Sequence, residues 1–232
     1  MMLALVHSPL TGPFVWQPAA QELARRGIEA LVPDVADHPS ATGPFWEQES
    51  MAAARSLRRV SGNVVLVAHS GAGPLLPAIA ERASFELAGY LFVDAGLPSD
   101  GASRLDEIRS GEAEWAAELE RQLRSGGRFP DWTEEDLLEI LPLKGLRRGL
   151  LDDLRPRPLD FFTEPIPVPA GWPDAPCGYL RLSAVYEGAR RRAAEQGWPT
   201  RSLAEGHFHM LVDPAGVVEE MVRLLDAMSV PA

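Results

Sequence analysis

The sequence predicts an α/β fold in which helices flank a mostly parallel central sheet. Several short segments are continuously apolar rather than alternating, which is typical of strands buried on both faces of a parallel sheet. These segments alternate along the chain with segments of helical periodicity, as in β-α-β units. The length of 232 residues and the hydrophobic content of 46% are enough for one sizeable core.

Six strands are expected, most of them short apolar runs. They are Leu3–Val6, Ile28–Val32, Val64–Ala68, Ala88–Val93, Gly178–Leu182 and Arg201–Leu203. The apolar stretch at the N-terminus has no basic residues before it and is too short for a signal peptide or a membrane span. We therefore expect it to form the first strand.

Four helices are expected between and after these strands. Gln17–Arg26 ends before Gly27, a residue suited to a helix C-terminus, and Phe45–Val60 repeats apolar residues along one side. Gly73–Arg82 carries two prolines, which the first turns of a helix tolerate because N–H groups there have no partner within the helix. Pro214–Met228 is the last helix.

The middle of the chain has a different pattern, without strand signals. Residues 104–125 are charged and helix-prone, and shorter helices are expected over Thr133–Leu141 and Leu143–Leu154. A proline-rich stretch follows, which we expect to be extended. The expected division is a core of residues 1–98 and 173–232 with a helical insertion of residues 99–172 over the sheet.

The charge of the chain argues against two classes of binding partner, and its cysteine content rules out an internal disulfide. The net charge is −11, which argues against nucleic acids and anionic membrane surfaces, since both attract basic proteins. Cys177 is the only cysteine, so no disulfide can form within the chain and a cytoplasmic setting is the simplest expectation. The loop with Asp34, Asp37 and His38 is not interpreted as a metal site, and no metal-ligand spacing of the zinc type is present.

The third expected strand ends at Ala68 and runs directly into the sequence HSGAG, which places Ser70 among small residues. A strand followed at once by a small-x-Ser-x-small turn and a helix is the setting of a nucleophile elbow. Small neighbours are needed there because the backbone closes tightly on itself. Gly73 stands one position later than the last glycine of the usual G-x-S-x-G. The same sequence also suits a tight turn whose serine caps the helix.

A serine hydroxyl is a weak nucleophile until a base accepts its proton. The C-terminal sequence AEGHFHMLVDP offers His207, on the loop before the last helix. His209 is expected to pack or hydrogen-bond locally instead, and His69, next to Ser70, is expected to be structural.

The chain resembles the α/β-hydrolase superfamily over nearly its whole length. The resemblance rests on the serine turn and on the G-H-x-x-x-L-x-x-P pattern that begins at Gly206. It also rests on the N-terminal sequence LVHSPLTGPFVW, which is similar to the first strand and oxyanion loop of that family. The resemblance implies an α/β-hydrolase fold with a helical cap, and a reaction that needs no cofactor.

Two acidic residues are candidates for the third member of a Ser-His-acid triad, which orients the histidine and stabilises its protonated form. Asp94 ends the fourth expected strand and precedes Pro98, an arrangement similar to that of the haloalkane dehalogenases. Glu187 follows the fifth strand, at the position more common in the family. We favour Asp94 because ligands bind at the carboxyl ends of strands in open α/β sheets. Glu187 remains an alternative.

The expected oxyanion hole departs from the family pattern. One donor would be the N–H group of Gly71, and the other usually comes from the residue after a His-Gly pair in the first loop. Here that residue is Pro9, which has no N–H group. Leu10 is the expected replacement, with the hydroxyl groups of Ser8 and Thr11 as alternatives.

The sequence therefore predicts a serine hydrolase, similar to carboxylesterases, that acts on a small ester or related acyl substrate through an acyl-enzyme. We expect a monomer or a homodimer that binds small molecules. Because Pro9 weakens the case for a full oxyanion hole, two alternatives stay open. One is a non-hydrolytic enzyme of the same fold, such as a lyase, an acyl-transferring cyclase or a tailoring enzyme of small-molecule biosynthesis. The other is a small-molecule receptor.

Overall fold

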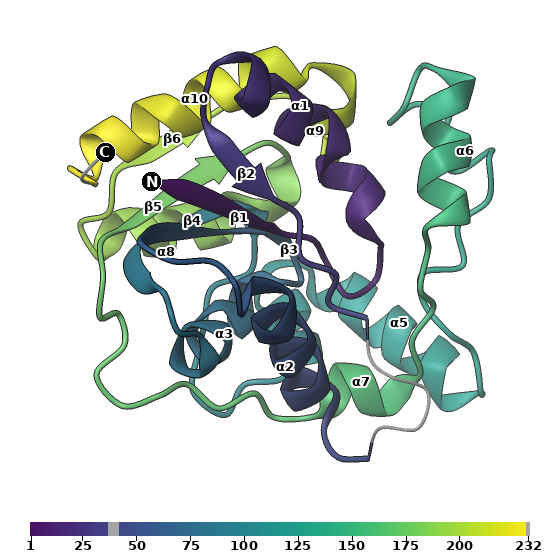
Figure 1. The fold of residues 1–232 in the computed structure, drawn as a ribbon. Helices are drawn as coiled ribbons and strands as arrows, with labels where there is room; N and C mark the ends of the chain where they lie inside the picture. Colours follow the sequence, from purple (N-terminus) through teal and green to yellow (C-terminus); the bar gives the residue numbers. More distant parts are fainter. Residues whose placement is uncertain (37–41, 231–232) are drawn as a thin grey trace.

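The structure is a computed structural model, and it describes residues 1–36 and 42–230. Six strands form one sheet in the order β2-β1-β3-β4-β5-β6, and every neighbouring pair runs parallel (Figure 1). The strands are β1 (Met2–Val6), β2 (Glu29–Leu31), β3 (Asn63–Ser70), β4 (Glu86–Ala95), β5 (Cys177–Arg181) and β6 (Thr200–Ser202). The predicted α/β fold is confirmed, and each predicted strand overlaps an observed one.

Helices cover both faces of the sheet, so that two apolar clusters form (Figure 1). On one face lie α1 (Gln17–Arg25), α9 (His209–Val212) and α10 (Pro214–Ala227), and on the other lie α2 (Phe45–Leu57), α3 (Leu76–Arg82) and α8 (Glu187–Glu195). Leu3 and Leu5 of β1 belong to the first cluster, whereas Ala4 and Val6 belong to the second. Because neighbouring residues of a strand point to opposite faces, a strand between two helical layers must be apolar throughout.

The insertion of residues 99–172 holds four helices at the right of Figure 1 and behind α2. They are α4 (Arg104–Gly111), α5 (Ala113–Arg124), α6 (Lys144–Asp152) and α7 (Leu159–Thr163). Side chains of α4, α5 and α7, together with Phe129, form a small apolar cluster of their own. Its buried members are Leu105, Ala116, Leu119, Leu123, Phe129, Phe161 and Phe162. The division of the chain into core and cap stays a prediction.

Two expectations for the insertion are wrong. Thr133–Leu141 does not form a helix but a series of turns. Leu137 and Leu141 are buried in the first apolar cluster, and Pro142 follows at once, so tertiary packing overrides the helical preference of a short segment. The proline-rich stretch is not extended throughout, because it contains α7.

The sheet order determines where functional side chains can meet. The carboxyl ends of parallel strands lie along one edge, and β3 lies between β1 and β4. The loops that follow β1, β3, β4 and β5 therefore converge at this edge, which is where ligands bind in open α/β sheets.

Candidate active site

Ser70 is the last residue of β3 and has a φ of 58°. This left-handed conformation is unfavourable for a residue with a Cβ, and such strain gathers at functional sites. The chain then turns sharply, since the N–H group of Ala72 donates to the carbonyl oxygen of His69 at 3.1 Å. No side chain caps the following helices, η2 (Gly73–Leu75) and α3. Ser70 is therefore presented at the end of a central strand rather than used as a helix cap.

Gly73 fits the turn closely against the loop after β4. A Cβ on Gly73 would stand 1.8 Å from the carbonyl oxygen of Gly96, so no larger residue is possible there without backbone movement. Gly96 in turn donates its N–H group to the carbonyl oxygen of Ser70 at 3.1 Å. The shifted glycine of the serine motif thus has a physical reason, because the loops after β3 and β4 touch at this point.

His207 and Asp94 form the central hydrogen bond of the site. His207 Nδ1 lies 2.8 Å from Asp94 Oδ2, and the carboxylate is fully buried. The backbone N–H groups of Leu182 and Ser183 donate to Asp94 Oδ1 at 2.7 and 2.8 Å, and Ser183 Oγ donates to Oδ2 at 2.6 Å. Burial alone would raise the pKa of Asp94, but the hydrogen bonds from His207 and Ser183 outweigh it and hold that pKa below its ordinary value. An ionised carboxylate therefore faces the imidazole.

Glu187, the other candidate acid, lies at the start of α8 and forms ion pairs elsewhere. Its carboxylate lies 2.6 Å from Arg190 and 3.1 Å from Arg181. The Arg190 guanidinium in particular lowers the pKa of Glu187. Among the described residues, no hydrogen bond or ion pair joins Glu187 to His207. The structure therefore brings Asp94 to His207 and does not bring Glu187 there.

Tyr186 is a residue of this site that sequence reasoning missed. It ends η3 (Ala184–Tyr186), and its Oη atom lies 3.3 Å from Ser70 Oγ. Its ring stacks on that of His207, with centroids 5.3 Å apart and planes at 15°. No hydrogen bond joins Ser70 Oγ to His207 within the described part of the chain, and such contacts are often long before substrate binds. The available signal was its place shortly after β5, at the edge where the other site residues lie.

His69 contacts both the backbone and the ring of His207. Its Nε2 atom donates to the carbonyl oxygen of His207 at 3.0 Å, and the two ring centroids are 4.4 Å apart. Burial, and then the proximity of His207, lower the pKa of His69 to about 3. A neutral His69 does not repel a protonated His207, which agrees with the structural role expected for His69. His209 lies in the first turn of α9, where its carbonyl oxygen accepts the N–H group of Asp213.

The loop after β1 lies beside the serine turn. A Cβ on Gly71 would stand 3.3 Å from Ser8 Oγ, so these two residues are in close contact. The N–H group of Leu10, which we expected to be the second oxyanion donor, donates to Ser8 Oγ at 3.3 Å. The hydroxyl of Thr11 is directed at the carbonyl oxygen of Ser8, at 3.4 Å. Of the three candidates, Ser8 thus has its hydroxyl next to Gly71.

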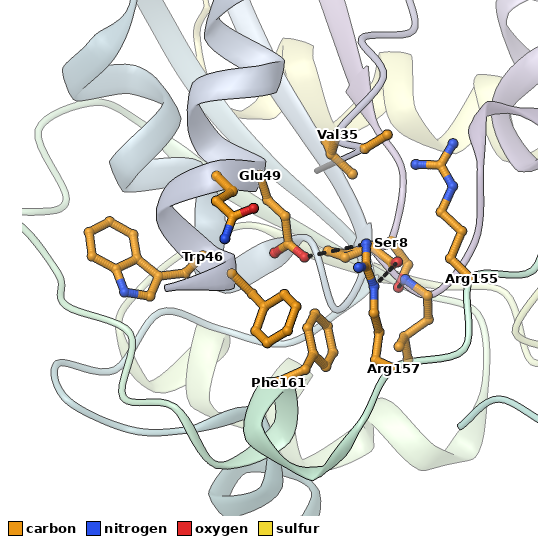
Figure 2. Close-up of polar contacts among 12 residues, drawn as sticks. Ser8, Val35, Trp46, Glu49, Arg155, Arg157 and Phe161 are labelled. Carbon is orange, nitrogen blue, oxygen red and sulfur yellow. Dashed lines mark hydrogen bonds and ion pairs between the residues drawn. The ribbon is translucent and has the colours of Figure 1, made fainter. Parts of the chain in front are cut away.

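The insertion holds this loop from the other side. The backbone N–H group of Arg155 donates to the carbonyl oxygen of Leu10 at 2.9 Å, and Arg157 Nε donates to that of Pro9 at 3.4 Å. Figure 2 shows the guanidinium of Arg157 between Ser8 and the carboxylate of Glu49, which is 3.9 Å away. The position of the loop after β1 therefore depends on contacts with residues far along the chain.

A comparison with protein-family models identifies the relatives of this chain. The model of the alpha/beta hydrolase family matches residues 3–220. The chain belongs to the alpha/beta hydrolase family. Its fold and the resemblance seen in the sequence are thereby confirmed.

Solved structures agree with the family at the level of the fold. One match is an extracellular alpha/beta-hydrolase from a Paenibacillus species, with a TM-score of 0.79 and 17% identity over 97% of this chain and 98% of its own. That protein is described as sharing structural and functional homology with tobacco salicylic acid binding protein 2. A pyrethroid hydrolase from Sphingobium faniae matches with a TM-score of 0.71 and 18% identity over 98% of both chains. A variant of tomato methylketone synthase I, in complex with β-ketoheptanoate, matches with a TM-score of 0.69 and 13% identity over 98% of both chains.

A comparison with curated protein sequences finds no match. No helix among residues 1–36 and 42–230 is both long enough and apolar enough to cross a membrane. Asp37 and His38, named above in connection with metal binding, lie outside the described residues. A cytoplasmic setting stays a prediction.

Proposed function

We propose that this alpha/beta hydrolase cleaves a small ester or a related acyl substrate through an acyl-enzyme, as carboxylesterases do. Ser70 is the nucleophile, His207 the base and Asp94 the acid that orients His207. The observation that carries the proposal is the 2.8 Å hydrogen bond between His207 Nδ1 and the buried carboxylate of Asp94, beside a serine in a left-handed conformation. A carboxylate that holds a histidine in this way prepares it to accept the proton of a serine hydroxyl.

The reaction begins with the tautomer of His207. Because the carboxylate of Asp94 accepts a hydrogen bond from Nδ1, the free Nε2 atom can accept the proton of Ser70 as Oγ attacks the acyl carbon. The protonated imidazole then gives this proton to the leaving-group oxygen. A water molecule, activated in the same way, attacks the acyl-enzyme and releases the acid. Asp94 stays ionised and stabilises the imidazolium in both halves of the reaction.

The negative oxygen of the tetrahedral intermediate needs two donors. We assign them to the N–H group of Gly71 and the hydroxyl of Ser8. The contact between these residues supports this assignment, as does the hydrogen bond from Leu10, which fills one lone pair of Ser8 Oγ and leaves its proton free to donate. In this way Ser8 replaces the N–H group that Pro9 lacks.

A non-hydrolytic reaction is the second candidate, and one observation favours it. The partner of Ser70 Oγ in this structure is Tyr186 rather than His207, and one compared structure is a methylketone synthase. If no ester is turned over while His207 and Asp94 are intact, a lyase-type reaction becomes the better proposal.

Hydrolysis of a series of p-nitrophenyl esters of increasing acyl length tests the proposal. The wild-type protein should release nitrophenol, and Ser70→Ala should abolish turnover. Asp94→Asn should lower kcat by about 10,000-fold, because the histidine takes the wrong tautomer. Glu187→Gln is the matched control and should stay within about twofold of wild type, since a surface ion pair contributes little. A large loss in Glu187→Gln with activity kept in Asp94→Asn would overturn the assignment of the acid.

A further inference from the structure

Tyr186 contacts both residues that carry out the proposed proton transfer. Its Oη atom lies 3.3 Å from Ser70 Oγ, and its ring stacks on His207. The hydroxyl is therefore within hydrogen-bond distance of the atom that forms the new bond.

The sheet order shows from which side Tyr186 reaches the serine. The loop with Ser8 follows β1, on one side of β3. Asp94 stands near the end of β4 and Tyr186 follows β5, and both strands lie on the other side of β3. In a tetrahedral intermediate on Ser70, the negative oxygen points to Gly71 and Ser8. The leaving group must point to His207, which protonates it. Tyr186 lies on the side of His207, and thus on the side of the leaving group.

Tyr186 is a donor and not a base. Burial raises the pKa of its phenol, and the hydrogen bond with Ser70 lowers it by less. The negative charges of Asp94 and Glu107 raise this pKa further. The phenol therefore keeps its proton in the pH range in which esterases work.

We propose that Tyr186 is a further catalytic residue, which donates a hydrogen bond to the leaving-group oxygen as the bond between acyl carbon and oxygen breaks. The proposal rests on the function proposed above. The Ser70 proton passes to His207 Nε2, Oγ bonds to the acyl carbon, and the carbonyl electron pair moves to the oxygen beside Gly71. When the intermediate collapses, the electron pair of the broken bond stays on the leaving oxygen, which takes the proton from His207. Tyr186 keeps its own proton throughout and, in the resting site, holds Ser70 Oγ.

This role selects a class of substrate. Negative charge that develops on the leaving oxygen of an aliphatic alcohol stays on that atom, whereas a nitrophenol spreads it over the ring and the nitro group. A hydrogen bond from Tyr186 therefore accelerates the cleavage of alkyl esters more than that of nitrophenyl esters. The site is thus suited to esters of aliphatic alcohols.

Two esters with the same acyl group, ethyl butyrate and p-nitrophenyl butyrate, test this proposal in Tyr186→Phe, which keeps the ring. We expect kcat/KM to fall about 10- to 100-fold for the ethyl ester, as for a lost hydrogen bond to a charged group. The fall for the nitrophenyl ester should be about threefold or less, as for a lost neutral hydrogen bond. Tyr90→Phe, whose hydroxyl contacts Asp174, is the matched control and should leave both rates unchanged.

Equal losses on the two esters, or no loss on either, would overturn the role of Tyr186, since a merely structural tyrosine would affect both leaving groups alike. Labelling with a fluorophosphonate separates this failure from a failure of the triad. If the wild-type protein is labelled at Ser70 and the ester ratio does not change in Tyr186→Phe, Tyr186 alone is misassigned. If the wild-type protein is neither labelled nor active on either ester, both proposals fall.

Discussion

Ser8 is the residue on which the proposed oxyanion hole depends. Its hydroxyl is the only polar group of its side chain, and it is buried beside Gly71. We predict that Ser8→Ala lowers kcat by about 100-fold, as for a lost oxyanion donor, with little change in KM. Steady-state kinetics on a nitrophenyl ester measure both values.

Thr11→Val provides the matched control for this variant. The backbone N–H group of Thr11 donates to the carbonyl oxygen of Ser8 at 3.0 Å, and the substitution keeps this bond. Removal of the longer hydroxyl contact should change kcat by about threefold or less. A larger loss in Thr11→Val than in Ser8→Ala would contradict the assignment of the second donor to Ser8.

Cys177 gives a separate prediction from its burial. Burial, and then the negative charge of Asp174, raise the pKa of the Cys177 thiol to about 12. Because the thiolate is the reactive form, and a higher pKa leaves less of it, we expect no modification by N-ethylmaleimide at mildly alkaline pH. Intact mass should show one adduct only after unfolding in guanidinium chloride. Rapid labelling of the folded protein would contradict the burial of β5 at this position.

Candidate site residues differed in how far their placement could be predicted from the sequence. The meeting of Ser70 and Asp94 at one edge of the sheet could be predicted because each stands at the end of an apolar strand, where parallel strands bring their loops together. Tyr186 and Ser183 could not, since their roles depend on how the loop after β5 folds back over Asp94 and Ser70. The sequence shows that both residues follow the fifth strand, but not which atoms their side chains contact.

At the scale of helices, a buried ion cluster joins the insertion to the core. Arg104 at the start of α4 lies 2.6 Å from Glu49 of α2 and 2.9 Å from Glu164, which follows α7. Glu164 also accepts the backbone N–H groups of Phe45 and Trp46, at 2.8 Å each, and so caps α2. This cluster lies close to Arg157, which contacts the loop after β1.

We predict that Arg104→Ala destabilises the protein by about 3–5 kcal/mol, because it leaves the buried carboxylate of Glu49 without this guanidinium. Arg109, on the same helix, is 46% exposed and pairs with Asp106 and Glu120. Arg109→Ala should therefore cost less than about 1 kcal/mol. Denaturant unfolding of both variants measures the difference. Equal losses would show that the buried cluster does not hold α4 to α2.

The helices of the sheet layers could be predicted better than those of the insertion. α1, α2 and α10 have an apolar side that packs on the sheet, so the periodicity of their sequence matches their packing. The turns of residues 133–141 and the helix α7 each bury only two large apolar side chains, which is too few to give a periodic pattern. Leu137 and Leu141 therefore reach the first apolar cluster from turns, and Phe161 and Phe162 reach the cluster of the insertion from the single helical turn of α7.

For the whole molecule, the predicted parallel sheet was correct because its physical cause acts along the entire chain. A strand covered by helices on both faces must be apolar at every position, and this is visible in the sequence of β1, β3 and β4. The order of the strands then brings Ser70, Asp94 and His207 to one edge. How residues 99–172 fold over that edge depends on long-range contacts, such as that between Arg157 and Pro9, which have no local sequence signal.

The proposed role of Ser70 is tested most directly by the intact mass of the protein after treatment with a fluorophosphonate, compared with that of Ser70→Ala. A phosphonate reacts only with a serine whose proton is accepted by a positioned base. We predict one adduct on the wild-type protein and none on Ser70→Ala. A folded wild-type protein without an adduct, or an equal adduct on both proteins, would contradict the claim that Ser70 is an activated nucleophile.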